Sequence, residues 1–300
     1  MVEEENFLGL IMVGRLGNHI GSLAAALSYA WDNKLPLKCP QLGNFPNPVQ
    51  VDQMLEPLKN DFLPETFYWP GMCNGYFPVY ERLLAVFPEL ACPIQENQVS
   101  IYQIHMQHNY RAYPIQPNMV FVGYFFNEKY FAHHKEKIKS LFQPTEGIVA
   151  YLNHKYSAIV NDPKSVGIQL RDYTNDGDKW VDNLTRRYFR EAVEQFDNSH
   201  RFYVCSHNKE YAKKLLDEVF VGSGKDVFYI QNEQDFIEFY FLARLKNLII
   251  SNSSFGWWAA YLSPHSDKKV IAPETKKWLR PEFSAEGLEM MPQTERWIPL

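Results

Sequence analysis

Four short polar stretches of this 300-residue sequence each follow an apolar run and precede a helical pattern. Glycine in such a turn permits a positive φ and lets the backbone approach a ligand closely. The following helix offers free N–H groups and a partial positive charge, which suit a phosphate or a sugar oxygen. The stretches are residues 14–19 (GRLGNH), 169–172 (QLRD), 206–208 (SHN) and 251–254 (SNSS).

Arg171 is the strongest candidate for anion binding among these residues. It follows a buried strand pattern, where a guanidinium is costly unless it meets an anion. Its planar fork suits a phosphate because it donates two parallel hydrogen bonds. A salt bridge to Asp172 or Asp176 is the structural alternative. A calcium loop built on Asp172, Asp176 and Asp178 is disfavoured by their spacing and by the missing glutamate at its end.

The other stretches have structural alternatives as well. Asn18 could offer its amide to a ligand, or it could be the N-cap of a helix over 20–32. Residues 206–208 could cap the next helix, with His207 as a surface histidine. The serines and the asparagine of 251–254 could give hydroxyl and backbone N–H groups to a diphosphate. No GxSxG or P-loop motif supports a serine hydrolase or a P-loop enzyme.

The elements that must position these stretches alternate as strand and helix from residue 146 onward. Short links between them predict right-handed βαβ units and a parallel sheet. In such sheets ligands bind beyond the carboxyl ends of the strands, where the polar stretches fall. The predicted strands are 165–170, 200–206, 226–231, 247–254 and 268–273, and the predicted helices are 147–160, 185–196, 208–220, 233–246 and 255–263.

The first half of the chain is predicted to be a less regular α/β unit. Residues 40–100 are rich in proline, asparagine and aromatic residues, which is typical of loops and short helices that form a binding surface. We therefore expect two α/β domains, 1–145 and 146–300, with a last helix that could pack back on the first domain. The other predicted elements are strands 7–13, 35–39 and 120–125 and helices 20–32 and 127–142.

Composition excludes several classes of partner. The net charge of −5 gives no reason to expect nucleic acid, and it allows at most a peripheral membrane contact. No apolar window is long enough to span a membrane, and the acidic start MVEEEN is unlike a secretory signal. The four cysteines have no zinc-ligand spacing, which favours reduced thiols in a cytoplasmic protein. The oligomeric state stays unknown at this point.

Three segments resemble motifs of glycosyltransferase family 11, the α-1,2-fucosyltransferases. Residues 14–30 (GRLGNHIGSLAAALSYA) are similar to its G-x-L-G-N-Q motif, which precedes an alanine-rich helix. Residues 123–131 (GYFFNEKYF) resemble G-Y-[FW]-Q-S-E-K-Y-F, and 238–278 resemble the block that contains I-I-S-N-S-S-F-S-W-W. The family's H-x-R-R-x-D motif corresponds to a segment with Gln169 in place of histidine and Arg171 as the first arginine.

The resemblance implies a GT-B-like fold with two Rossmann-type domains facing across a cleft. The N-terminal domain would lie on the acceptor side, and the C-terminal domain would bind GDP-fucose without a metal or other cofactor. The implied reaction is inverting transfer of L-fucose to a glycan hydroxyl, with an α-1,2 link to galactose. The alternatives are a catalytically inactive GDP-sugar or glycan-binding protein and a protein O-fucosyltransferase, whose sequences the GRLGN stretch also resembles.

The same resemblance assigns roles to individual residues. Arg171 would stabilise the charge that grows on the departing β-phosphate, and Asn18 would position the acceptor hydroxyl or the sugar. His19 and Asp172 are the candidates for a general base, although a reaction driven by its leaving group need not use one. The residues expected to bind the donor are Gly17, Gln169, Ser206, His207, Asn208, Glu238, Asn252, Ser253, Ser254 and Phe255.

Overall fold

The computed structural model describes residues 6–43, 76–105, 110–174, 180–281 and 297–300. The chain divides into two compact units, Met1–Thr145 and Glu146–Leu300. Within the described residues, no helix has both the length and the hydropathy needed to span a membrane. Free thiols are present at three described positions, Cys39, Cys92 and Cys205.

The first unit contains a parallel sheet with strand order β2-β1-β4-β3. The chain leaves β1 toward β2 on one side and returns through β3 and β4 on the other. The carboxyl ends of β1 and β4 therefore flank the position at which the strand order reverses, where such sheets bind ligands. The strands are β1 (Leu8–Met12), β2 (Leu37–Lys38), β3 (Ile101–His105) and β4 (Met119–Gly123).

The helices of this unit differ from the sequence-based prediction at two places. The first helix begins at Leu16 rather than at residue 20, and its buried residues extend to its first turn. The helix predicted over 127–142 is three separate segments. The observed helices are α1 (Leu16–Asn33), α4 (Phe77–Val86) and α5 (Lys135–Leu141), with short 3-10 segments η1 (Pro40–Leu42), η3 (Pro88–Ala91), η4 (Glu96–Gln98), η5 (Glu128–Tyr130) and η6 (Ala132–His134).

The second unit contains a parallel sheet with strand order β10-β9-β8-β5-β6-β7. The chain runs outward through β5, β6 and β7, and then through β8, β9 and β10 on the other side. This is the strand order of the Rossmann fold, with its switch point between β5 and β8. The strands are β5 (Ser165–Gln169), β6 (Arg201–Cys205), β7 (Asp226–Tyr229), β8 (Asn247–Ile250), β9 (Lys269–Ala272) and β10 (Trp297–Pro299).

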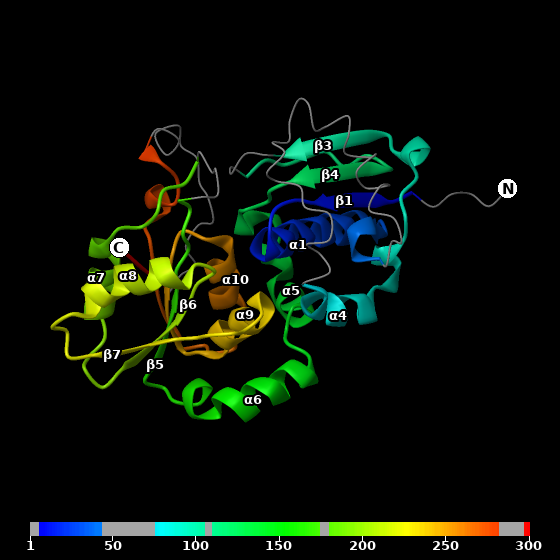
Figure 1. Ribbon diagram of the computed structural model, residues 1–300. Helices are drawn as coiled ribbons and strands as arrows, with labels where there is room; N and C mark the ends of the chain where they lie inside the picture. The colour runs from blue at the N-terminus through cyan, green and yellow to red at the C-terminus, as the bar shows by residue number, and fades with distance from the viewer. Residues whose placement is uncertain (1–5, 44–75, 106–109, 175–179, 282–296) are drawn as a thin grey trace. The chain divides into compact units, whose positions relative to one another are not determined.

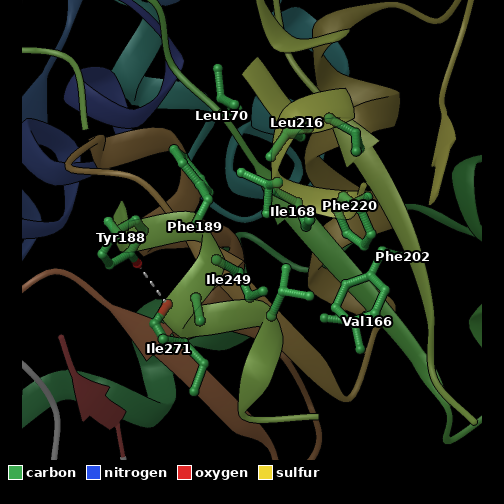
Figure 2. Close-up of a cluster of buried hydrophobic side chains, with 14 of the residues drawn as sticks. Val166, Ile168, Leu170, Tyr188, Phe189, Phe202, Leu216, Phe220, Ile249 and Ile271 are labelled. Carbon is green, nitrogen blue, oxygen red and sulfur yellow. Dashed lines mark hydrogen bonds between the residues drawn. The ribbon is translucent and has the colours of Figure 1, made fainter. Parts of the chain in front are cut away.

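Helices cover both faces of this second sheet (Figure 1). On one face, apolar side chains of α7 and α8 pack against β5, β6, β8 and β9. Figure 2 shows this core. The Tyr188 hydroxyl lies 2.6 Å from the Ile250 carbonyl and 3.4 Å from the Ile271 carbonyl, so Ile250 is its main acceptor. The helices are α6 (Glu146–Val160), α7 (Arg186–Glu194), α8 (Lys209–Phe220), α9 (Asp235–Arg244) and α10 (Ser254–Leu262), and a 3-10 segment η7 (Thr275–Lys277) follows β9.

The predicted α/β class with parallel sheets is confirmed, and β3 and β10 are additions that the sequence did not predict. β10 is short and pairs with β9, extending the sheet by one edge strand. A closing helix that returns to the first unit would have to fall on residues 282–296, which lie outside the described residues. Cys73, Asp176 and Asp178 lie outside them too.

Candidate active site

At the switch point of the second sheet, hydrogen bonds join the loops that follow β5 and β8. The Ser251 hydroxyl accepts a 2.9 Å hydrogen bond from the Arg171 backbone N–H. The same hydroxyl lies 3.0 Å from both the backbone carbonyl and the side-chain Oε1 of Gln169, and it can donate to one of them. The Ser251 N–H donates to the Gln169 carbonyl at 3.1 Å. The backbone at Arg171 is therefore fixed at the edge where this fold binds ligands.

The Arg171 side chain is partly exposed and lies over an aromatic ring. Its guanidinium carbon is 5.3 Å from the ring centre of Tyr173, a distance at which a cation and a π-face attract each other. The Tyr173 hydroxyl donates a 2.8 Å hydrogen bond to the carbonyl of Asn252 in the loop after β8. Tyr173 thus connects the two loops and supports the arginine at their junction.

Asp172 is buried and holds the loop after β5 in place. One of its oxygens accepts hydrogen bonds from the Thr174 N–H at 3.0 Å and from Asn183 Nδ2 at 2.9 Å. The other accepts from Asn208 Nδ2 at 2.8 Å. Burial alone would raise the pKa of Asp172, but these hydrogen bonds and that of the Thr174 hydroxyl keep it below its ordinary value. A carboxylate stabilised in this way is a poor proton acceptor, so the geometry favours a positioning role over the expected role as base.

The predicted stretch 206–208 mainly caps the helix that follows it. Asn208 is the N-cap of α8, and its Oδ1 accepts a 3.1 Å hydrogen bond from the Tyr211 N–H. The Ser206 hydroxyl donates to the Asn208 carbonyl at 3.1 Å. His207 is exposed. The capping interpretation is confirmed for Ser206 and Asn208, and the link from Asn208 to Asp172 joins this turn to the loop after β5.

The stretch after β8 leads directly into α10. Ser253 is the N-cap residue of this helix, without a side-chain cap, and Ser254 is its first residue. Asn252 is buried and donates to the carbonyls of Asp182 at 3.0 Å and Trp278 at 3.3 Å. Within the described part of the chain, its Oδ1 has no hydrogen-bond partner. The Ser253 N–H donates to the Ser251 carbonyl at 2.7 Å, so the loop after β8 enters α10 through a hydrogen-bonded turn.

The aromatic residues of α10 belong to the core. Trp257 and Trp258 are fully buried and pack edge to face with ring centres 5.1 Å apart, which confirms the core interpretation over a sugar-stacking platform. Phe255 is only partly buried, and its ring meets Phe239 of α9 edge to face at 5.3 Å. Phe255 thus joins the first turn of α10 to α9.

The buried Glu238 pairs with the partly exposed Lys209, between the first turns of α9 and α8. Burial raises the pKa of Glu238 to about 7, although Lys209 opposes the shift. Helices α8 and α9 begin after β6 and β7, so the pair lies at the carboxyl side of the sheet. A carboxyl group with this pKa can either accept or donate a hydrogen bond near neutral pH.

Two positions at which the sequence departs from the family motifs are neighbours in the structure. A Cβ atom at Gly256 would lie 2.6 Å from Oε1 of Gln169, so the glutamine side chain occupies the space that any larger residue at 256 would need. The family motifs have histidine and serine at these two positions. Gln169 and Gly256 therefore fit against each other at the switch point.

In the first unit, the side chain of Asn18 packs against Gly14 of the turn that follows β1. Gly14 has a φ of +81°, and a Cβ atom there would lie 2.1 Å from Nδ2 of Asn18. The helix begins at Leu16 with Arg15 in the N-cap position, so the alternative of Asn18 as N-cap is wrong. Gly17 is buried in the first turn. The glycine at 14 is needed both for its backbone angle and for the space that the Asn18 amide fills.

His19 is a buried residue in the first turn of α1. It is 2% exposed, and its Nδ1 lies 2.9 Å from the Tyr80 hydroxyl. Burial lowers the pKa of His19 to about 4, and a hydrogen bond with the backbone of Gly14 offsets only part of this effect. The imidazole is therefore neutral and inaccessible near pH 7, which does not favour the expected role as general base.

The sequence interpretation did not single out a polar cluster at the carboxyl end of β3. Nδ1 of His105 lies 2.5 Å from the Tyr113 hydroxyl, and its Nε2 lies 3.2 Å from the Tyr130 hydroxyl. The His105 carbonyl would be 2.2 Å from a Cβ atom at Gly123, whose φ is +128°. The signal that could have found it is a histidine at the end of the alternating segment IYQIH, opposite the glycine that ends the next strand.

Comparisons with known proteins agree with this arrangement. Residues 89–294 match the sequence model of the family described as glycosyl transferase family 11. An α-1,2-colitosyltransferase of Escherichia coli is 32% identical over 298 residues, which cover 96% of each chain. The chain therefore belongs to glycosyltransferase family 11. A second Escherichia coli protein, the O-antigen biosynthesis glycosyltransferase WbnK, is 25% identical over 170 residues, which cover 52% of this chain and 54% of the relative.

A solved structure shares the fold. The NodZ α-1,6-fucosyltransferase, soaked with GDP-fucose, aligns with a TM-score of 0.52 and 15% sequence identity. The alignment covers 91% of this chain and 97% of that one. The GT-B-like class expected from the resemblance is thus confirmed for the fold.

Proposed function

We propose that this family 11 glycosyltransferase transfers L-fucose from GDP-fucose to a glycan hydroxyl, with inversion, to form an α-1,2 link to galactose. The observation that carries the proposal is the position of Arg171 at the β5–β8 switch point, with its backbone fixed by Ser251 and its guanidinium over Tyr173. Family membership supports the reaction class, and the name of the α-1,2-colitosyltransferase relative supports the linkage.

In the proposed reaction, the bond between C1 of the sugar and the β-phosphate oxygen breaks as the acceptor oxygen forms its bond to C1. The transition state resembles an oxocarbenium ion, and negative charge grows on the departing phosphate. The Arg171 guanidinium and backbone N–H groups in the first turn of α10, which begins at Ser254, would stabilise that charge. Because the charge develops only as the bond breaks, this interaction accelerates the chemical step rather than substrate binding alone.

The acceptor proton is proposed to leave without a dedicated protein base. Asp172 is fully engaged by neutral donors, and His19 is buried with a pKa of about 4. The reaction would then be driven by stabilisation of the leaving group, and the proton would pass to the departing phosphate or to water. We also propose that no metal takes part, because Arg171 supplies positive charge where a metal ion would otherwise be needed.

The remaining donor contacts are assigned by their position at the same edge. Glu238, paired with Lys209, is proposed to meet hydroxyl groups of the nucleotide. Gln169, Asn252 and Phe255 would shape the surface on which the diphosphate and sugar lie. In the first unit, Asn18 is proposed to meet the acceptor, since its loop follows β1 beside β4 at the position where the strand order of that sheet reverses.

A second donor is favoured by one specific comparison, the colitosyltransferase relative. Colitose is fucose without its 3-hydroxyl group, so both sugars place the same leaving group at C1. A site that hydrogen-bonds the 3-hydroxyl rejects the analogue that lacks it by a large factor, whereas an apolar pocket does not. The ratio of kcat/KM for GDP-fucose and GDP-colitose therefore assigns the donor.

The test of the proposal is GDP release from GDP-fucose, with and without a β-galactoside acceptor and in the presence of EDTA. We expect acceptor-dependent GDP release that EDTA does not reduce, with an α-1,2-linked product by NMR. Tight GDP binding without turnover would support the inactive binding protein instead. Transfer to a protein hydroxyl but not to galactosides would support the protein O-fucosyltransferase alternative, and loss of activity in EDTA would contradict metal independence.

A further inference from the structure

Three metal-ligating side chains meet on the surface of the first unit, in a cluster that the transferase proposal does not use. Asp32 lies in the last turn of α1, and His133 and His134 lie in η6. Oδ2 of Asp32 is 2.8 Å from Nε2 of His133, and Oδ1 is 2.8 Å from Nε2 of His134. One ligand atom from each of the three residues can be chosen so that all lie within 4.8 Å of one another. Each imidazole thus directs the nitrogen that a metal would use toward one shared carboxylate.

Packing holds both ligand-bearing segments in this arrangement. The ring of His134 meets Trp31 edge to face with ring centres 5.1 Å apart, and Lys137 covers Trp31 with its Nζ 3.4 Å from the ring centre. The segment that precedes η6 is fixed by Asn127, whose Oδ1 caps η5 through a 3.0 Å hydrogen bond from the Lys129 N–H. The two histidine rings lie 4.4 Å apart. A metal would therefore need only small side-chain adjustments to bind.

The ligand set selects the class of metal. Two imidazoles and one carboxylate suit Zn²⁺ and neighbouring divalent transition metals, whereas Mg²⁺ and Ca²⁺ prefer oxygen ligands alone. The side chains of Asp32 and His133 are 45% and 49% exposed, which leaves room for water as a fourth ligand. The ordinary alternative is a pair of histidine–carboxylate hydrogen bonds, as at the surface pair His200 and Asp197, which has a single imidazole.

We propose that Asp32, His133 and His134 form a binding site for a divalent transition metal such as Zn²⁺ in the first unit. The site cross-links the end of α1 to η6. Because the three ligands converge only in the folded chain, the metal binds the native state and stabilises it in proportion to its occupancy. The proposal is independent of the donor chemistry assigned to the second unit.

The test is calorimetric titration of the full chain, without a polyhistidine tag, with ZnCl₂. We expect a saturable site of about one Zn²⁺ per chain that excess Mg²⁺ does not displace. The variants Asp32→Asn, His133→Ala and His134→Ala should each lower the affinity by at least about 10–100-fold, since even residues outside the ligand shell contribute that much. The matched control is His200→Ala, which removes an imidazole that also faces an aspartate and should leave the affinity unchanged.

Two further readouts make the outcome decisive. Zn²⁺ should raise the Tm of the wild type and of His200→Ala but not that of His133→Ala or His134→Ala. Cu²⁺, a quenching ion of the same ligand preference, should reduce the fluorescence of the wild type more than that of Trp31→Phe, because Trp31 touches His134. Absence of a saturable Zn²⁺ site in the wild type would overturn the proposal. So would affinities and Tm shifts that the ligand substitutions leave unchanged.

Discussion

The loops that follow the central strands of the two units occupy the same topological position, yet they use their polar residues in opposite ways. After β1, the side chain of Asn18 fills the space beside Gly14, and His19 is buried against Tyr80. After β5, the buried hydrogen bonds hold the backbone and Asp172, while the Arg171 side chain stays partly exposed over Tyr173. The first turn packs the partly exposed Asn18 against its own glycine and buries His19, whereas the second loop presents the Arg171 cation at the edge of the sheet.

The comparison teaches that a motif of ligand-binding residue types can be largely architectural. Topology identifies where a ligand is expected to bind, because both loops lie where the strand order of their sheet reverses. Which residues can act there depends on their exposure and on their internal hydrogen bonds. The following substitutions test whether the two loops differ in this way.

The largest effect is expected at the second loop, from Arg171→Lys. Lysine keeps the charge but loses the planar fork that donates two hydrogen bonds. We expect kcat to fall by about 10²–10³-fold, or roughly 3–4 kcal/mol, with little change in Tm. Arg187→Lys is the matched control, because Arg187 is exposed and pairs only with Glu191 on its own helix among the interactions described. Equal activity of Arg171→Lys and the wild type would remove Arg171 from the mechanism.

The next effect tests the first loop through its glycine. Gly14→Ala meets both a positive φ and the Asn18 side chain 2.1 Å away. Gly222→Ala is the matched control, since Gly222 has a φ of +74° with nothing within 4 Å of the added Cβ. The control should lose about 1–2 kcal/mol of stability from backbone strain alone. Gly14→Ala should lose more, measured by urea unfolding, and equal losses would contradict the packing role of Asn18.

A smaller effect tests the packing of the second loop. Gly256→Ser should lower both stability and donor affinity, because the added atoms displace Gln169. Combining it with Gln169→His, the pair of residues found in the family motifs, should restore part of the loss. A double-mutant cycle in urea unfolding should give a coupling energy of about 0.5–3 kcal/mol. Additive effects would show that the two departures are unrelated.

The smallest effect on activity is expected from His19→Gln in the first loop. A buried, neutral imidazole takes no proton, so kcat should stay within about threefold, whereas loss of a general base costs about 10²–10⁴-fold.

The buried imidazole of His19 should also make the free energy of unfolding depend on pH. Burial lowers the pKa of His19 to about 4 in the folded chain, whereas a histidine in the unfolded chain has a pKa of about 6.5. As the pH falls from about 6.5 toward 4, the unfolded chain therefore takes up the proton and the folded chain does not. The contribution of His19 to the free energy of unfolding is lost over this range.

His19→Gln removes that contribution. Its free energy of unfolding should therefore decline less than that of the wild type between pH 6.5 and 4, as measured by urea titration at each pH. A large loss of kcat with a shifted pH–rate profile would instead return His19 to the mechanism as a base.

The second unit was largely predictable from the sequence, for a physical reason. Its central strands β5 and β8 are buried on both faces and therefore appear as continuous apolar runs. Short links then fix the alternation of strand and helix, and with it the edge at which residues 169–172 and 251–254 lie. The predicted helix over 185–196 and the observed α7 (Arg186–Glu194) differ only at their ends.

The first unit was harder to predict because its local signals are weaker. Glycine at 17 lowers helix propensity, so the apolar periodicity that indicates a helix begins only near Ile20 in the sequence. The strand β3 is partly exposed along most of its length and lacks a continuous apolar run. Segment 127–142 has a helical composition, but the buried side chains of Tyr130 and Phe131 divide it into short 3-10 segments before α5.

Within the site, the residue types could be predicted from the sequence, but the hydrogen bonds and ring contacts that each side chain makes could not. The sequence placed Asp172 and Asn208 at the ends of neighbouring strands, and the structure joins them by a 2.8 Å hydrogen bond. It could not reveal that the four hydrogen bonds on Asp172 leave it unsuited to accept a proton. The role of Tyr173 as a support for Arg171 likewise depends on a contact across the two loops that has no signature in sequence spacing.

The most direct test of the central claim is a crystal structure of the wild-type protein with GDP bound. The account predicts a β-phosphate oxygen about 2.7–2.9 Å from the Arg171 guanidinium, with backbone N–H groups of the first turn of α10 directed at the same diphosphate. A diphosphate bound at the loop after β1 instead, or Arg171 paired with a carboxylate away from the nucleotide, would contradict it.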